Sequence, residues 1–120
     1  MANIFTKLPL SSSISGKQII ISSTTSQSAI PIHGTLTDPT SIDEIWLYGY
    51  NDSTASLILS CLWGGVKEPD DVVRITIPPK QGRYLLADGK LLQGGLSASC
   101  YASTGNWIAI DGFVNRITTI

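Results

Sequence analysis

The stretch that decides the fold is residues 44–63, EIWLYGYNDSTASLILSCLW. Its first half alternates, so that Trp46, Tyr48 and Tyr50 share one face of an expected strand and aliphatic residues share the other. The Asn-Asp-Ser sequence that follows is typical of a turn between neighbouring strands. The second half, residues 56–63, is apolar on both faces, as in a central strand that is covered on both sides. Together these features predict two adjacent β-strands.

The rest of the chain repeats this pattern of short strands and turns. Gly, Pro, Asn and Asp punctuate β-prone runs at intervals of roughly ten residues, and no segment has the periodicity of an amphipathic helix. Asp88-Gly89 is expected to form a tight turn. The pattern predicts an all-β, single-domain antiparallel β-sandwich, with the jelly-roll class preferred over other sandwiches. The expected strands are residues 18–22, 28–35, 44–51, 56–63, 72–77, 83–87, 91–92, 96–102, 107–110 and 113–117.

The first 16 residues, MANIFTKLPLSSSISG, differ from the rest of the chain. They show neither strand nor helix periodicity, yet they contain large apolar side chains. An ordinary terminal tail is polar and frayed, so we expect residues 1–16 to form an extended N-terminal arm. The arm docks either on a neighbouring molecule or on its own domain, and residues 17–120 form the sandwich.

Composition excludes several classes of partner. The formal net charge is −1, and the eight Lys and Arg residues are scattered, whereas a nucleic-acid binder gathers basic residues on one face. No run of 18 apolar residues is present, so we expect no membrane span. The start of the chain lacks the pattern of a secretory signal peptide, which indicates synthesis and folding in a cytoplasm.

The chain is poor in groups that carry out acid–base catalysis. His33 is the only histidine, and it lies on an apolar strand, where a partly buried or rim position is expected. Nearly all nine acidic residues lie in expected turns, where their side chains bond nearby backbone amides. We therefore expect no enzyme and no cofactor.

Two cysteines and one acidic loop are the candidate positions for a disulfide or a metal ion. Cys61 and Cys100 fall in apolar strands and are expected to be small buried hydrophobic residues, with a disulfide or a metal site as the less favoured alternatives. Glu68, Asp70 and Asp71 form an acidic loop that lacks EF-hand spacing, so turn formation is favoured over calcium binding.

Two stretches resemble a known family. Residues 43–65, DEIWLYGYNDSTASLILSCLWGG, and residues 75–117, which end in GFVNRI, are similar to small virion structural proteins of tailed bacteriophages. The resemblance implies a non-enzymatic virion protein, and a capsid decoration (cement) protein on the outer surface of the head is the first choice. Its partners would be the major capsid protein and further copies of itself in a homotrimer. The N-terminal arm is outside the resemblance.

The apolar residues of the arm and of the closing strand are the expected contacts with other subunits or with the capsid. Extended arms and apolar β surfaces join neighbouring subunits in symmetric assemblies. The expected contact residues are Ile4, Phe5, Leu8, Leu10, Phe113, Val114 and Ile117.

An alternative is a carbohydrate-binding or receptor-binding module of a phage tail or fibre. It depends on Trp46, Tyr48 and Tyr50 forming an exposed platform for a glycan, because sugar rings stack on aromatic surfaces. The pattern does not decide which face of this strand is buried, and packing is favoured over a ligand platform for these aromatic residues.

Overall fold

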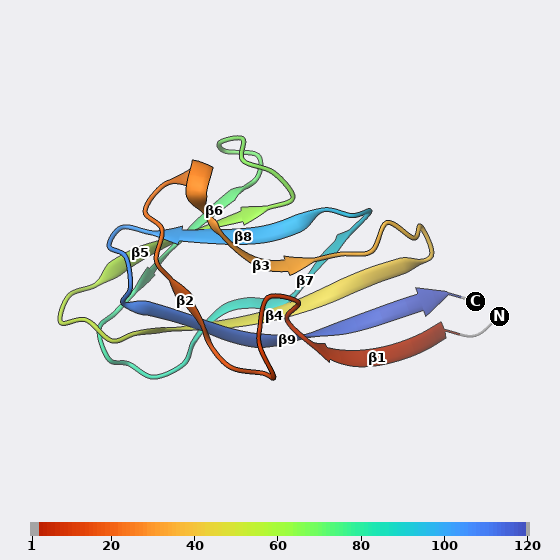
Figure 1. Cartoon of the computed structure of the whole chain (residues 1–120), viewed down its shortest axis with the longest axis horizontal. Helices are drawn as coiled ribbons and strands as arrows, with labels where there is room; N and C mark the ends of the chain where they lie inside the picture. The colour runs from red at the N-terminus through yellow and green to blue at the C-terminus, as the bar shows by residue number, and fades with distance from the viewer. Residues whose placement is uncertain (1–2, 120) are drawn as a thin grey trace.

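The computed structural model describes residues 3–119 and shows an all-β sandwich of two antiparallel sheets, as predicted (Figure 1). Sheet A has five strands. Its order is β1 (Asn3–Pro9), β9 (Ile108–Thr119), β4 (Ser41–Asn51) and β7 (Tyr84–Gln93), and β2 (Ile19–Ile21) also pairs with β9. Sheet B has the order β3 (Ile30–Gly34), β8 (Ser97–Ala102), β5 (Leu57–Trp63) and β6 (Val72–Ile77). One 3-10 turn, η1 (Ser26–Ser28), precedes β3.

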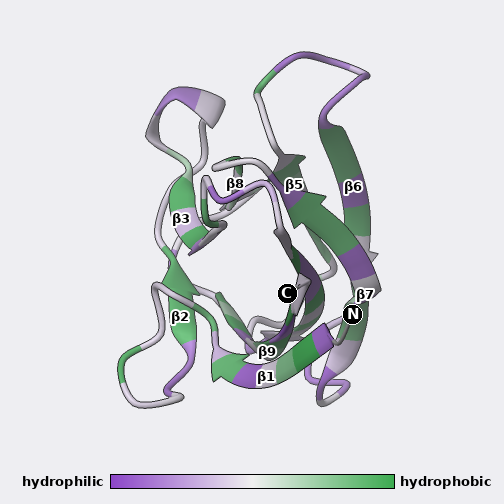
Figure 2. Cartoon of the chain, turned by 90° about the vertical axis from the view of Figure 1, so that its right-hand side faces the viewer, coloured by the Kyte–Doolittle hydropathy of each residue, from purple (hydrophilic) through white to green (hydrophobic). Residues whose placement is uncertain are grey.

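Strand alternation builds the core between the two sheets, which Figure 2 shows as two layers viewed along the long axis. On β4 the inward residues Ile45 and Leu47 are fully buried, whereas the residues between them are half-exposed. Each such side chain contributes about 1.5–3 kcal/mol relative to an exposed position. The aliphatic face of residues 44–51 is therefore the core face, and the aromatic face points outward.

β7 is one continuous strand, so the predicted turn at Asp88-Gly89 is wrong. Lys90 pairs with Ile45 and Asp88 pairs with Trp46, which leaves Gly89 as an extra residue in a β-bulge. Gly89 has φ 87°, a conformation that suits a bulge as well as a turn. The local sequence cannot separate these two uses of glycine.

β9 is likewise one strand of 12 residues, where two separate strands were predicted. Gly112 lies where the break was expected. A Cβ atom at this position would lie only 2.0 Å from the carbonyl oxygen of Trp46 on β4. Glycine therefore lets β9 pass close to β4 and keep its pairing from end to end.

Much of the predicted N-terminal arm belongs to sheet A. Residues 3–9 form β1, which pairs along its whole length with β9, and Leu10 is in the core. Figure 1 shows that β1 and the adjoining ends of β9 and β4 extend beyond the strands of sheet B. No described segment is a helix long and apolar enough to cross a membrane. Met1 and Ala2 lie outside the described residues.

Candidate functional site

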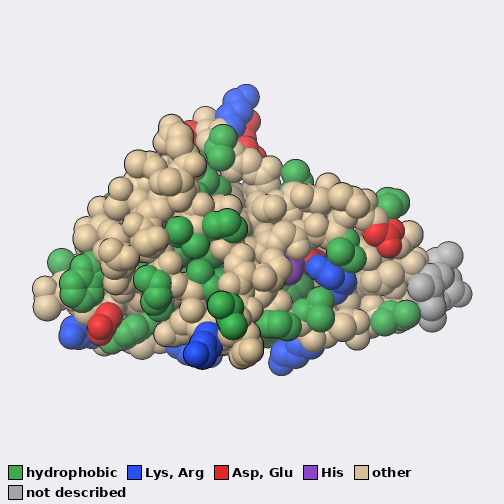
Figure 3. Space-filling model, in the orientation of Figure 1, with side chains coloured by type: hydrophobic (Ala, Val, Ile, Leu, Met, Phe, Trp, Pro, Cys, Tyr) green, Lys and Arg blue, Asp and Glu red, His purple; other side chains and the backbone are tan. Residues whose placement is uncertain are grey.

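The outer face of sheet A gathers the aromatic residues that the sequence singled out. Trp46, Tyr48 and Tyr50 of β4 all point to this face and are half-buried. β9 lies next to β4 and adds Phe113 directly opposite Trp46. Figure 3 shows hydrophobic side chains interspersed with Lys and Arg along the side of the molecule formed by sheet A.

Trp46 and Phe113 belong to a row of stacked groups that we call the aromatic ladder: Lys7, Phe113, Trp46 and Gly89. The rings of Trp46 and Phe113 are nearly parallel, at 9°, with centroids 5.9 Å apart. The Lys7 ammonium lies 4.5 Å from the Phe113 centroid, on the β1 side of β9. A Cβ atom on Gly89 would lie 3.1 Å from the Trp46 ring. Neighbours therefore cover the faces of both rings.

The two tyrosines of the stripe are also held by neighbours. The Arg83 guanidinium lies 4.0 Å above the centroid of Tyr48, and its Nε atom is 3.1 Å from a carboxylate oxygen of Asp111. The Tyr50 hydroxyl donates a hydrogen bond of 3.0 Å to Asp52, which raises the pKa of Tyr50. The stripe is thus exposed at its ring edges, while two of its three rings have covered faces.

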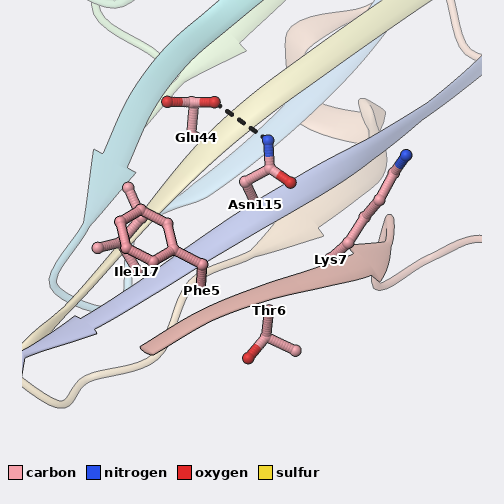
Figure 4. Close-up of a pocket in the computed structure, with 6 residues that line it drawn as sticks. All are labelled: Phe5, Thr6, Lys7, Glu44, Asn115 and Ile117. Atoms are coloured by element: carbon pink, nitrogen blue, oxygen red, sulfur yellow. Dashed lines mark hydrogen bonds between the residues drawn. The ribbon is translucent and has the colours of Figure 1, made fainter. Parts of the chain in front are cut away.

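A hollow of about 310 Å³ lies on the same face between β1, β9 and β4 (Figure 4). Phe5 and Ile117 form an apolar wall, and Lys7 lies beyond Asn115. One carboxylate oxygen of Glu44 accepts hydrogen bonds from Asn115 Nδ2 at 3.1 Å and from Trp46 Nε1 at 3.2 Å. The hollow combines an aromatic wall with fixed polar groups, the combination that binds small polar ligands.

A buried ionic cluster lies on the opposite, core-facing side of sheet A. Asp43 of β4 is 1% exposed, and Arg116 of β9 donates two hydrogen bonds to its carboxylate, at 2.8 and 2.9 Å. His33 of β3, also buried, lies with Nε2 2.7 Å from Asp43 Oδ2. Burial raises the pKa of Asp43, but the bonds from Arg116 and His33 outweigh it and hold the pKa below its usual value.

The contacts of His33 define its tautomer. The backbone N–H of Ser11 can only donate, so His33 Nδ1, at 3.0 Å, is the acceptor. The ring proton is then on Nε2 and is donated to Asp43. The Ser11 hydroxyl does not contact the ring, because it accepts from the Gly34 N–H at 2.8 Å. Both nitrogens of His33 are used, so the cluster joins the N-terminal segment and both sheets rather than activating a nucleophile.

Sequence reasoning missed this cluster, although part of the signal was available. Asp43 lies one residue before the expected strand of residues 44–51, but it is two residues before Ile45 and so shares the core face of β4. Arg116 is two residues after Val114 and shares the core side of β9 in the same way. Their pairing with each other and with His33 depends on strand order, which the pattern does not give.

The predicted contact residues separate into two groups. Ile4 and Phe5 are exposed, at 49% and 69%, whereas Leu8 is half-buried. Phe113 and Ile117 point to the outer face of sheet A and are half-exposed. Leu10 and Val114 are buried in the core and are not accessible to another subunit, because alternation turns them inward.

The cysteines contact each other, and the acidic residues of the 68–71 loop contact basic groups or backbone amides nearby. Cys61 and Cys100 are free and buried on β5 and β8, with sulfur atoms 3.5 Å apart. Their mutual hydrogen bond and burial raise the pKa of Cys100. In the acidic loop, Glu68 pairs with Arg74, Asp70 with Lys67, and the Asp71 carboxylate accepts the Lys67 N–H. Within residues 3–119, no group of three His, Cys, Asp or Glu side chains could hold a metal ion.

No protein-family model, curated protein or solved structure matches this chain. The outer face of sheet A, with its aromatic stripe and hollow, is therefore the surface of the described residues from which a function can be proposed.

Proposed function

We propose that this chain is a non-enzymatic structural protein of a tailed-phage particle, a capsid decoration protein that binds the major capsid protein and stabilises the head shell. The observation that carries the proposal is the apolar outer face of sheet A. Phe5, Leu85 and Leu91 on this sheet are each at least half exposed, and Trp46 and Phe113 lie between them. Exposed apolar side chains gathered on one face in this way favour a protein interaction site.

The charges on this face also favour a protein partner. Arg83 is paired with Asp111, Lys7 lies on the Phe113 ring, and Glu44 is hydrogen-bonded to Asn115. Because most of these charges have partners within the chain, the face offers aromatic and aliphatic side chains with few unpaired charges among them. Aromatic enrichment with few unpaired charges favours a protein partner over a nucleic acid.

The strand order supports the jelly-roll class within the sandwich. From β2 to β9, every connection except the β5–β6 hairpin crosses from one sheet to the other. Double-sheet jelly rolls of eight strands are found in viral capsid proteins and in lectins. This support is an analogy of fold, since a fold hosts many functions.

A second candidate is a glycan-binding or receptor-binding module of a tail or fibre, and the hollow between β1, β9 and β4 favours it. Phe5 offers an exposed ring, and Lys7, Glu44 and Asn115 offer hydrogen-bonding groups beside it. Since the faces of Trp46 and Tyr48 are covered, a sugar would bind in the hollow rather than on the aromatic stripe.

Immunogold electron microscopy of purified phage particles from the source culture tests the first proposal. Antibody against this chain should label the heads evenly. Label confined to tails or fibres would instead support the second candidate, and absence of label from every particle would overturn both virion roles. A second experiment tests the hollow directly: the isotope-labelled chain is titrated with a panel of glycans, and binding in the hollow should change the NMR chemical shifts of Phe5 and Asn115.

A further inference from the structure

β1 is an edge strand that is covered on neither face. Among the described residues it pairs with β9 alone, and no backbone hydrogen bond reaches its outer edge. Ile4 pairs with Thr118, which places it on the core side of sheet A, yet it is 49% exposed; Figure 1 shows that β1 extends beyond the strands of sheet B. Phe5 points to the outer face and is 69% exposed. Such a strand buries little apolar surface in a single copy of the chain.

The outer edge of β1 is also well formed for pairing. Its seven residues follow β9 in unbroken register, so the strand is regular along its length. Free edges of this kind are templates for another strand, and proteins usually protect them with proline, bulges or charge. β1 carries Lys7 and Pro9, but it has no bulge. β3 carries Pro31 and a register shift, and β7 has two register shifts against β4.

Two further edges differ from β1. β2 has only three residues, and two of them, Ile19 and Ile21, are buried. β6 is anchored on one side. Ile77 of β6 is buried and Ile75 packs against the core. Arg74 in the middle of β6 is paired with Glu68. β6 is therefore stabilised within one copy of the chain, and β1 is the edge that gains most from a partner strand.

We propose that β1 pairs antiparallel with β1 of a second copy across a two-fold axis, which joins the two A sheets into one continuous sheet. A sheet edge accepts an extended strand, and β1 is itself an exposed strand with a free edge, so the two edges are mutually complementary. The proposal goes beyond the proposed function and does not depend on where the protein acts. It gives a dimer where the resemblance to phage virion proteins implies a homotrimer.

The proposed pairing has its two-fold axis at Phe5, a register that charge and burial favour over an axis at Lys7. If the axis passes at Lys7, the two ammonium groups lie directly opposite each other, which is destabilising. If the axis passes at Phe5, Lys7 lies opposite Asn3 of the partner subunit, and Phe5 lies opposite Phe5 of the partner subunit. This register partly covers the Phe5 side chain, which is 69% exposed in a single copy of the chain.

Sedimentation equilibrium of the full chain tests the pairing. The native chain should show twice the chain mass, and Phe5→Lys should lower the mass two-fold, because it places like charges opposite each other. Leu91→Lys is the matched control: Leu91 is 52% exposed on the opposite edge of sheet A, and this variant should keep the native mass. A native monomer, a native trimer, or a Phe5→Lys variant of unchanged mass would overturn the proposal.

Disulfide trapping provides a test that does not depend on the lysine variant folding. Opposed residues of antiparallel strands have Cβ atoms about 5 Å apart, so Phe5→Cys should form a covalent dimer when treated with oxidised glutathione. Cys61 and Cys100 are buried, and Leu91→Cys should stay monomeric on a non-reducing gel. Absence of the Phe5→Cys dimer, or equal trapping by Leu91→Cys, counts against the pairing.

The pairing and the proposed function fail separately. If the chain is a dimer in solution but its antibody does not label phage particles, the pairing is supported and the decoration role is overturned. A monomer whose antibody labels the heads would do the reverse.

Discussion

Asp43 carries a charged side chain in the core, where burial of a charge is most costly in free energy. Its carboxylate is almost fully buried, and an isolated buried charge costs several kcal/mol. Arg116 and His33 offset this cost with three hydrogen bonds from two other strands. The three side chains therefore depend on one another. Removal of any one of them leaves a buried charge or hydrogen-bond donor without a partner, which destabilises the fold.

Arg116→Met should lower the free energy of unfolding by about 3 kcal/mol, since breaking a buried ion pair leaves the Asp43 charge uncompensated. Urea unfolding at neutral pH measures the change. Arg74→Met is the control, because Arg74 and its partner Glu68 are about half exposed, and the free energy of unfolding should hardly change. A similar, small effect of both variants would mean that water reaches Asp43.

The same carboxylate should make the stability depend on acid pH. The pKa of Asp43 in the folded chain lies below its unfolded value of about 3.9, so its contribution is fully present above that pH. The contribution is lost as the pH falls from about 4 through the folded pKa. Urea unfolding at a series of pH values should show a steep acid limb that Asp43→Asn flattens. Asp70→Asn, at an exposed carboxylate, should retain the limb.

At the scale of the element, β4 and β9 share the longest pairing of the sandwich, and Gly112 lets them approach. Gly112→Ala would place a methyl group 2.0 Å from the Trp46 carbonyl oxygen, so the two strands must separate locally. We expect a loss of more than about 3 kcal/mol, which is typical of severe backbone and packing strain.

Gly82→Ala separates steric contact from backbone strain. Gly82 has φ 74° but open space around its Cα, so alanine there should cost only about 1 kcal/mol. Thermal unfolding of both variants measures the difference. If the two variants lose equal stability, the close approach of β9 to β4 is not what requires glycine at position 112.

The elements also show what local sequence can and cannot predict. Alternation over residues 44–51 is enough to assign β4 and its two faces, because the period of two is a local property. At Gly89 and Gly112 the sequence predicted a turn and a break, and both residues lie inside continuous strands. Both glycines lie close to Trp46, which is distant in sequence: an added Cβ atom would lie 3.1 Å from its ring at Gly89 and 2.0 Å from its carbonyl oxygen at Gly112.

In the candidate site, too, some features can be predicted from local sequence and others depend on the strand order. The aromatic stripe of β4 could be predicted from alternation alone, whereas the aromatic ladder could not. Phe113 stacks on Trp46, and Lys7 lies over Phe113, only because β1, β9 and β4 are adjacent in sheet A, and local patterns do not give strand order. The buried partners of Asp43 were missed for this reason also.

At the scale of the whole molecule, the N-terminal segment has two parts with different roles. Residues 3–9 are attached to one neighbouring strand, whereas Leu10 is in the core and the Ser11 N–H bonds His33. The boundary between a removable strand and a structural segment therefore lies near Pro9, well before the end of the predicted arm at residue 16.

Two truncations test this boundary. Deletion of residues 1–8 should leave a sandwich that unfolds cooperatively with a modest loss of stability. Deletion of residues 1–11 should cost about 2–5 kcal/mol more, because it empties the site of Leu10 and removes the bond from Ser11 to His33. Urea unfolding of both chains measures the difference. Equal stability of the two would show that Leu10 and Ser11 contribute little.

Asn3 and Thr119 are opposite residues of β1 and β9, so the two ends of the described chain leave the molecule at the same tip (Figure 1). A force applied between the two ends then acts across the strands instead of along them. The β1–β9 pairs would open one after another, like a zipper, starting at the tip, while the hydrophobic core carries no load. Tension on this protein would therefore peel away one strand at low force long before the sandwich itself yields.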